Sequence, residues 1–327
     1  MRILARVHAY PPHHNAGAEW AAHNLLRALA ERGHRVEVWL SHGTGRRDPY
    51  ELDGVRVFPG VVDPQVFGRQ VRTADVVITH LENVRPAAAA ARGWGKPLVV
   101  LCHNTFPQTF HALVGTTDLV VYNSAWMREA AARWFAASPR AKRPRREIVV
   151  RPPVRVQDYA ATPGDHITLV NLYKPKGSET FWELAERMPD RRFLGVRGGY
   201  GDQDVRELPN VEVIDNVPGD RMRDEVYART RILLMPSEYE SWGRVGVEAM
   251  CSGIPVIAHP TPGLRESLGD AGIFADLADI AGWQKAIEAL DDPDVYKKAS
   301  AAAKKRARQL DPADDLARWC DAVEALR

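Results

Sequence analysis

This sequence has few cysteines, almost no net charge and no long hydrophobic run. Its three cysteines are odd in number and have no metal-ligand spacing, so we expect a reducing, cytoplasmic environment. No stretch approaches the roughly 20 apolar residues that span a bilayer, and the start, Met1 to Arg6, is too short and too charged for a signal peptide. With 327 residues and a net charge of +2, the composition is that of a soluble globular protein with room for two domains.

The sequence also lacks the dinucleotide-binding fingerprint and a metal motif. Neither the loop at residues 10–19 nor the glycine cluster at residues 195–201 matches G-x-G-x-x-G. Two Asp-x-Asp spacings, at residues 202–204 and 292–294, fall in polar stretches away from the other motifs. We interpret both as solvated loops, and we expect neither a metal ion nor a cofactor.

What the sequence does contain is a regular alternation of short β-branched runs with helical patterns. This alternation is typical of parallel sheets built from βαβ units. It restarts after a linker predicted over residues 152–165, which indicates two domains with a ligand cleft between them, and a last helix near residues 312–326 is expected to return across the gap. The predicted division is 1–155, 156–310 and 311–327. The predicted strands are 3–7, 36–40, 55–58, 76–78, 98–101, 119–122, 148–151, 167–170, 192–195, 211–214, 231–235, 256–258 and 272–274.

The most informative segment runs from Pro236 to Ala258. It leaves a hydrophobic strand, crosses a polar turn that carries Glu240, and opens a helix that carries Glu248. Ligands of open α/β sheets bind at this carboxyl edge of the strands. Ionised carboxylates accept several strong hydrogen bonds from a hydroxyl-rich ligand, while Gly243 and the helix amides suit a phosphate. The combination predicts a nucleotide-sugar site; the alternative is a helix-capping glutamate beside an ordinary surface glutamate.

Two lysines and two histidines also follow predicted strands. Lys174 and Lys176 precede a helix, where two ammonium groups would hold a diphosphate and neutralise the leaving group; ordinary surface lysines are the alternative. His103 follows the strand at residues 98–101, where it would hydrogen-bond a substrate hydroxyl. A satisfied structural histidine explains the same position, and His80 is the weaker candidate of the two.

The loop between the first strand and the first helix, predicted over residues 18–32, is rich in small residues. Gly17 and Ala18 open the helix, and helix N-termini favour anions; a plain turn is the alternative. From the later glycine cluster, we include Gly198 among the candidate donor-binding positions.

A strongly basic run that ends at Arg146 follows a helix that begins at Ala125. Trp126 and Trp134 lie on one face of this helix. Aromatic side chains beside arginines are found at interfacial and anionic surfaces, so this segment is a candidate for peripheral contact with the inner face of a membrane. The alternative is a helix that packs its aromatic side chains into the core, followed by a solvated loop.

Together these residues resemble family 4 of the retaining glycosyltransferases, of GT-B architecture, over nearly the whole chain. The spacing Glu240-x7-Glu248, followed by Ala249-Met250, matches that family's E-x7-E signature, and His103 falls where the family has its first-domain active-site histidine. The other similarities are the first loop, Gly33-His34-Arg-Val36, Lys176-Gly177, Gly253, Pro255-Val256, Pro262-Gly-Leu-Arg-Glu266 and the last helix around Trp319.

The resemblance implies an α/β protein of two Rossmann-like domains whose parallel sheets face an interdomain cleft. It also implies that Glu248 binds the ribose hydroxyls, that Glu240 binds the hydroxyls of the transferred sugar, and that Lys176 holds the diphosphate. The implied catalytic set is Glu240, His103 and Lys176. The predicted donor-binding set is Glu248, Lys174, Asn171, Gly17, Ala18, Gly198, Asn216, Val217, Gly243, Gly263 and Leu264, with Asn216 and Val217 near the nucleoside base.

Two positions depart from the family pattern. The diphosphate arginine expected five residues before Lys176 is Asn171, and Lys174 is the candidate replacement for its charge. The first loop has Gly17-Ala18 in place of two glycines, which adds a methyl group where a phosphate should approach.

The predicted function is retaining transfer of a sugar from a nucleoside-diphosphate sugar to a hydroxyl acceptor. The implied front-face reaction needs no metal, because the leaving phosphate oxygen takes the proton of the acceptor. One alternative is a GT-B enzyme similar to nucleotide-sugar 2-epimerases, and another is a non-catalytic module that binds a nucleotide sugar or nucleic acid. We expect a monomer or weak dimer, and an acceptor that the motifs do not name: a glycan, a lipid-linked molecule, a protein or a small molecule.

Overall fold

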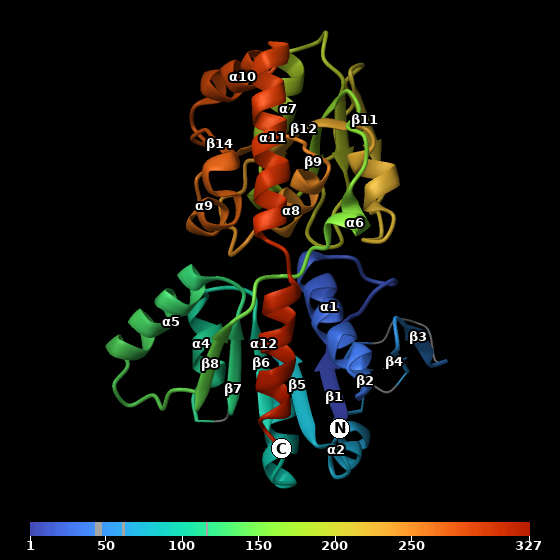
Figure 1. Ribbon diagram of the computed structural model, residues 1–327, viewed down its shortest axis with the longest axis vertical. Coiled ribbons are helices and arrows are strands. Elements are labelled where there is room, and N and C mark those ends of the chain that lie inside the picture. The colour runs from blue at the N-terminus through green and yellow to red at the C-terminus, as the bar shows by residue number, and fades with distance from the viewer. Residues whose placement is uncertain (43–47, 61–62, 116) are drawn as a thin grey trace. The chain divides into compact units, whose positions relative to one another are not determined.

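The computed structural model describes residues 1–42, 48–60, 63–115 and 117–327, and these form two units with one mostly parallel sheet each (Figure 1). The first unit comprises Met1–His14, Ala18–Pro153 and Pro312–Arg327, and the second comprises Asn15–Gly17 and Val154–Asp311. The predicted α/β class with two Rossmann-like sheets is confirmed.

The strands of the first unit are β1 (Arg2–Val7), β2 (Arg35–Leu40), β3 (Tyr50–Leu52), β4 (Val55–Phe58), β5 (Val76–His80), β6 (Leu98–Cys102), β7 (Leu119–Tyr122) and β8 (Arg146–Val149). Their order in the sheet is β3-β4-β2-β1-β5-β6-β7-β8, and only β3 and β4 pair antiparallel among the described strands. β5, β6 and β7 are buried along their whole length, as expected for a parallel sheet with both faces covered.

Helices cover both faces of this first sheet. Successive residues of β1 point to opposite faces, so Ile3 and Leu4 lie in different buried clusters. Ile3 packs with α1 (Gly17–Glu31) and α12 (Ala313–Glu324), where the Trp319 indole N–H donates to the Leu25 carbonyl at 2.8 Å. The helices that pack with Leu4 are α2 (Pro64–Val71), α3 (Val84–Gly93), α4 (Pro107–Leu113) and α5 (Ala125–Ala137).

The strands of the second unit are β9 (His166–Val170), β10 (Phe193–Val196), β11 (Val211–Ile214), β12 (Thr230–Met235), β13 (Val256–Ala258) and β14 (Gly272–Phe274), in the sheet order β11-β10-β9-β12-β13-β14. Every one of these pairs is parallel. One face carries α6 (Val156–Tyr159), α8 (Arg244–Cys251), α9 (Pro262–Leu268) and α11 (Pro293–Gln309). The other face carries α7 (Ser178–Arg187) and α10 (Ile280–Ala289).

The structure corrects three details of the sequence prediction. The edge strand β3 was not predicted, and β8 is Arg146–Val149 rather than residues 148–151. The linker predicted over residues 152–165 contains α6, which packs against α8: the Ser252 hydroxyl donates to the Tyr159 carbonyl at 2.8 Å. Most of that segment is therefore part of the second unit. Among the described residues, no helix combines the length and apolar character needed to cross a bilayer.

Candidate functional site

Glu240 lies on the turn between β12 and α8. The turn requires glycine at Gly243, which precedes the helix with φ of +77°, a conformation that side chains with a Cβ rarely adopt. A Cβ there would also collide with the side chain of Leu264. The turn is therefore held against α9, and its geometry depends on this glycine.

A lysine from the neighbouring strand meets Glu240 at this turn. Lys176 ends a short 3-10 turn, Lys174–Lys176, that follows β9, and β9 lies beside β12 in the sheet. The Lys176 Nζ lies 2.5 Å from Glu240 Oε1, and the Ser237 hydroxyl donates to the same oxygen at 3.2 Å. Two of the predicted catalytic residues are thus in direct contact.

The environment of Lys176 keeps it charged. Burial by itself would lower the pKa of Lys176, but the Glu240 carboxylate and the Tyr200 hydroxyl raise that pKa above its usual value. Gly177, the next residue, has φ of +90° and lies so close to Pro236 that a Cβ would collide with it. The glycine thus lets the lysine turn approach the end of β12.

The N-terminus of α9 reaches the same turn. A Cβ on Gly263 would collide with the Glu240 carbonyl and with the backbone of Ser241. The backbone amide of Leu264, however, donates to the Thr261 hydroxyl at 3.2 Å. Gly263 and Leu264 are the two predicted phosphate-binding positions on this loop. The amide of Leu264 already caps the helix, and Gly263 packs closely against the Glu240 turn.

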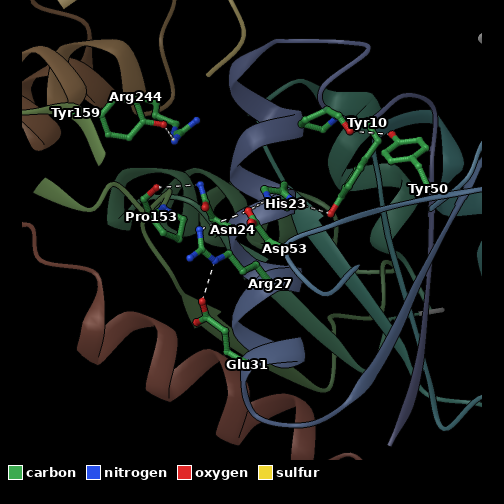
Figure 2. Close-up of polar contacts among 11 residues, drawn as sticks. Tyr10, His23, Asn24, Arg27, Glu31, Tyr50, Asp53, Pro153, Tyr159 and Arg244 are labelled. Atoms are coloured by element: carbon green, nitrogen blue, oxygen red, sulfur yellow. Dashed lines mark hydrogen bonds and ion pairs between the residues drawn. The ribbon is translucent and has the colours of Figure 1, made fainter. Parts of the chain in front are cut away.

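Glu248 lies on α8, within a buried network of polar side chains. Its side chain is about 5% exposed, and Oε1 pairs with the Arg244 guanidinium at 3.2 Å. The Tyr227 hydroxyl donates to Oε2 at 2.5 Å. Arg244 in turn donates to the Tyr159 hydroxyl at 2.6 Å, a contact that Figure 2 shows. Burial raises the pKa of the Glu248 carboxyl, and Arg244 partly offsets this rise. Sequence reasoning missed Arg244, Tyr159 and Tyr227, which give Glu248 a structural role besides the predicted contact with ribose.

Asn171 has a backbone role at the end of β9. Its φ is +76°, a left-handed conformation that asparagine tolerates better than most residues. Its side-chain oxygen accepts from the Gln203 amide at 3.0 Å, and the Gln203 oxygen accepts from the amide of Gly198 at 2.7 Å. A Cβ on Gly198 would collide with Asn171. Asn171, Gln203 and Gly198 thus lock two strand ends together, and Gln203 was not predicted.

The other candidates of the second unit contact residues other than Lys176 and Glu240. Lys174 is exposed and pairs with Glu179 at 2.8 Å, and that contact raises the pKa of Lys174. The side-chain amide of Asn216 donates to the Arg197 carbonyl at 3.3 Å. Val217 is 7% exposed and packs in the core, so only its backbone is suited to contact a base.

In the first unit, His103 belongs to a group of histidines at the carboxyl edge of the sheet. Its Nε2 lies 3.0 Å from His80 Nδ1. The His8 ring lies 5.5 Å from the His80 ring and 5.7 Å from the His42 ring, centroid to centroid. Burial lowers the pKa of His103 to about 4 and lowers that of His80 well below its usual value. Both rings are therefore neutral at physiological pH.

The first loop brings two more residues to this edge. The Nε2 of His8 lies 2.9 Å from Glu19 Oε1, and Nδ1 of His14 lies 3.8 Å from the same oxygen. Gly17, the first residue of α1, has no atom within 4 Å of the position of an added Cβ, and Ala18 is half-buried. Sequence reasoning missed His8, His14 and Glu19. A signal was present, because a histidine ends or closely follows each of β1, β2, β5 and β6.

The helix α5 packs differently from the predicted pattern. It buries Met127, Ala131 and Phe135, while Trp134 is half-buried with its ring 4.7 Å from that of His111. In the basic run, Arg146 begins β8 and donates to the Ala325 carbonyl at 3.1 Å. A cavity of about 520 Å³ is lined by residues of α3, α4, α5 and this run, among them Arg85, His111, Trp134 and Arg140, and by none of the predicted donor-binding residues.

Comparison with known proteins covers both halves of the chain. Residues 15–156 match the model of Glycosyltransferase Family 4, and residues 204–306 match that of Glycosyl transferases group 1. The glycogen synthase of Mycobacterium tuberculosis is 25% identical over 94% of this chain and 90% of its own length. The D-inositol 3-phosphate glycosyltransferase of Corynebacterium aurimucosum is 30% identical over 56% of this chain and 50% of its own length.

Solved structures with the same fold extend over the full chain. Sucrose-phosphate synthase from Thermosynechococcus elongatus has a TM-score of 0.79 at 15% identity, covering 100% of this chain and 99% of that one. Anabaena HepE in complex with UDP-glucose has a TM-score of 0.79 at 16% identity, covering 99% of this chain and 100% of that one. These similarities in sequence and architecture identify the chain as a member of the family 4-like glycosyltransferases of GT-B fold.

Proposed function

We propose that this glycosyltransferase transfers a sugar from a nucleoside-diphosphate sugar to a hydroxyl acceptor with retention of configuration, and that the transfer step needs no metal ion. The observation that carries the proposal is the contact between Lys176 and Glu240 at the carboxyl edge of the second sheet. It places a permanent cation and a hydrogen-bond acceptor side by side. A nucleotide sugar presents the matching groups, a diphosphate joined to a ring of hydroxyls.

Lys176 can bind a phosphate without releasing Glu240. An ammonium group has three N–H donors, and Lys176 uses one toward Glu240 and one toward Tyr200. The remaining donor supports the role of Lys176 at the diphosphate, where a fixed positive charge stabilises the negative charge that develops on the leaving group. In the front-face reaction, that leaving oxygen then accepts the proton of the acceptor hydroxyl.

Glu240 and Glu248 have separate roles in this proposal. Glu240 accepts hydrogen bonds from the transferred sugar through Oε2, since Lys176 and Ser237 already donate to the two lone pairs of Oε1. Glu248 binds the ribose through lone pairs that Arg244 and Tyr227 leave unused, because an ionised carboxylate offers about four acceptor positions. The buried contacts to Arg244 and Tyr227 hold that carboxylate in one orientation.

The first experiment measures the release of nucleoside diphosphate from a panel of donors, with and without candidate acceptors. UDP-sugars are the first donors to test, because the structurally similar HepE was solved in complex with UDP-glucose. We expect release with one donor type, its loss in Lys176→Ala and in Glu240→Gln, and no loss in Lys174→Ala, whose side chain is exposed and paired elsewhere. Equal rates in all four proteins would show that the Lys176–Glu240 pair is not the transfer site.

The stereochemistry and the metal requirement are tested separately. From an α-linked donor, the first product observed by NMR should be the α-anomer, and excess chelator should leave the rate unchanged. An initial β-product would overturn retention, and a rate that chelator abolishes while nucleotide binding is unchanged would overturn the metal independence of the transfer step. Epimerised donor without transfer would favour the epimerase-like alternative, and salt-sensitive retention on DNA without diphosphate release would favour a binding module.

A further inference from the structure

Three side chains of the first unit converge on a point that the transfer proposal does not use. His8 directly follows β1, His14 lies on the next loop, and Glu19 is in the first turn of α1. One ligand atom from each lies within 4.8 Å of the others. All three residues lie within residues 8–19, so the path of this one segment brings them together.

The polar atoms of this cluster are incompletely satisfied. Glu19 is 3% exposed, and its Oε2 has no hydrogen-bond partner among the described residues. The Nδ1 atom of His14 is buried and equally without a hydrogen bond within that part of the chain. A buried polar atom left unpaired costs about 1–3 kcal/mol, more if it is charged, so such atoms in a native protein call for an explanation. A cation bound by the Glu19 carboxylate and by Nδ1 of His14 would neutralise the carboxylate and give that nitrogen a partner.

The types of ligand and their spacing suit a divalent transition metal. Two imidazoles and one carboxylate form a three-residue set that zinc sites use with a fourth position open. Tetrahedral bonds of about 2.0–2.1 Å place ligand atoms about 3.3 Å apart. The observed separations from Glu19 Oε1, 2.9 Å to His8 and 3.8 Å to His14, lie on either side of that value.

The surroundings of His8 also resemble those of a metal ligand. Its Nε2 faces Glu19, while its Nδ1 has no hydrogen-bond partner among the described residues and lies 3.6 Å from a carboxylate oxygen of Glu82. A carboxylate on the far nitrogen of a ligating histidine fixes the ring and raises its basicity. The rings of His42 and His80 pack against His8 and limit its rotation further.

The loop that carries His14 is anchored to the fold on its other side. The Tyr50 hydroxyl donates to the Pro11 carbonyl at 2.8 Å, and buried Tyr10 contacts His23, which pairs with Asp53 (Figure 2). His14 therefore does not depend on the metal for its approximate position. From this geometry we infer that His8, His14 and Glu19 bind a divalent transition ion, of which Zn²⁺ is the best match, and that the ion ties the first loop to α1.

The test is a metal titration of the whole chain after treatment with chelator and dialysis. Zn²⁺ should bind at one equivalent and raise the melting temperature, and Co²⁺ in its place should give the intense visible absorption of a four-coordinate site. His14→Ala should weaken Zn²⁺ binding by more than tenfold, and Glu82→Gln by about tenfold, the lower end of the usual range for an outer partner. His14 is half-buried, so its removal leaves the core intact.

The matched control is His13→Ala. His13 is the neighbouring residue on the same loop and packs against the Tyr50 ring, so its removal disturbs the loop and leaves all three ligand residues in the sequence. It should bind Zn²⁺ as the unaltered protein does. Equal affinity in His14→Ala and His13→Ala, or no binding at one equivalent by the unaltered protein, would overturn the proposal. Glu19→Gln, which keeps the side-chain size, gives an independent check that should also lose binding. These readouts do not depend on transferase activity, so the metal site and the transfer proposal fail or stand independently.

Discussion

The two sheets carry different chemistry at the same carboxyl edge. In the second unit the ionisable side chains next to the predicted donor residues are paired: Lys176 with Glu240, and Glu248 with Arg244 and Tyr227. In the first unit, the edge is made of histidines, and burial lowers the pKa of His103 to about 4.

The two edges differ in the charge state of the side chains that they offer to a ligand. Complete ion pairs keep their charge and geometry over a wide pH range, which suits a ligand that is always anionic. Neutral imidazoles give up no charge on burial, and several of their neighbours' atoms lack partners among the described residues. Such an edge responds to pH and to metals, whereas the other does not. Four predictions test this difference.

The largest effect is expected from Glu248→Ala. It leaves the buried Arg244 guanidinium without its carboxylate, and breaking a buried pair in this way costs about 3–5 kcal/mol. Urea unfolding should show this loss, with exposed Glu238 as the control, since Glu238→Ala should unfold like the unaltered protein. If Glu248→Ala is as stable as the control, the paired network is not a structural element.

The second effect is the loss of transferase rate in Lys176→Ala. Removing one preorganised donor at a developing charge typically costs about 10²–10³ in kcat. The double variant with Glu240→Ala should lose less than the sum of the two single losses, because the side chains are in contact and act together. Initial rates on the best donor measure this, and strict additivity would mean that the two residues act independently.

The third prediction is an acid sensitivity that belongs to the histidine edge. Burial is the main cause that lowers the pKa of His103 to about 4, against about 6.5 in an unfolded chain. The folded state therefore resists protonation, so its stability is full above about pH 6.5 and falls as the pH drops toward 4, by up to roughly 3 kcal/mol. Denaturation in chelator over this range should give a flatter profile for His103→Asn than for His111→Asn. Identical profiles would remove His103 as the cause.

The smallest effect is expected for Lys174→Ala. Its partner Glu179 is also exposed, and exposed pairs contribute little to stability. The measurement is the affinity for nucleoside diphosphate. A clear loss of affinity in Lys174→Ala would mean that Lys174 replaces the arginine that the family has at Asn171. We expect a change of less than about twofold, which ordinary exposed pairs would give.

The regular strand pattern made most of the fold predictable, and the exceptions have physical causes. β3 is only Tyr50–Leu52, and its antiparallel pairing depends on Asp53 and Gly54, which have φ of +49° and +76°. Asp-Gly is the dipeptide that favours a two-residue hairpin turn, so a signal for β3 was present. With only three residues, β3 is too short to show the alternation that marks the strands of parallel βαβ units.

The residues of the candidate site also fall into those that the sequence made predictable and those that it did not. Glu240 and Lys176 were predictable because each follows a recognisable strand, and adjacent parallel strands end at the same edge. The network around Glu248 was not, because Tyr159 lies in a segment that resembled a linker. Asn171 looked like a lost charge, and its backbone conformation of φ +76° explains asparagine at that position without any reference to a ligand.

The division of the chain into units has a consequence for its synthesis. The second unit is almost continuous in sequence, whereas the first is completed by Pro312–Arg327. Trp319, fully buried and bonded to the Leu25 carbonyl, fills one face of the first core. During translation, the part of the first unit that is made first therefore keeps an open hydrophobic face until α12 has been synthesised.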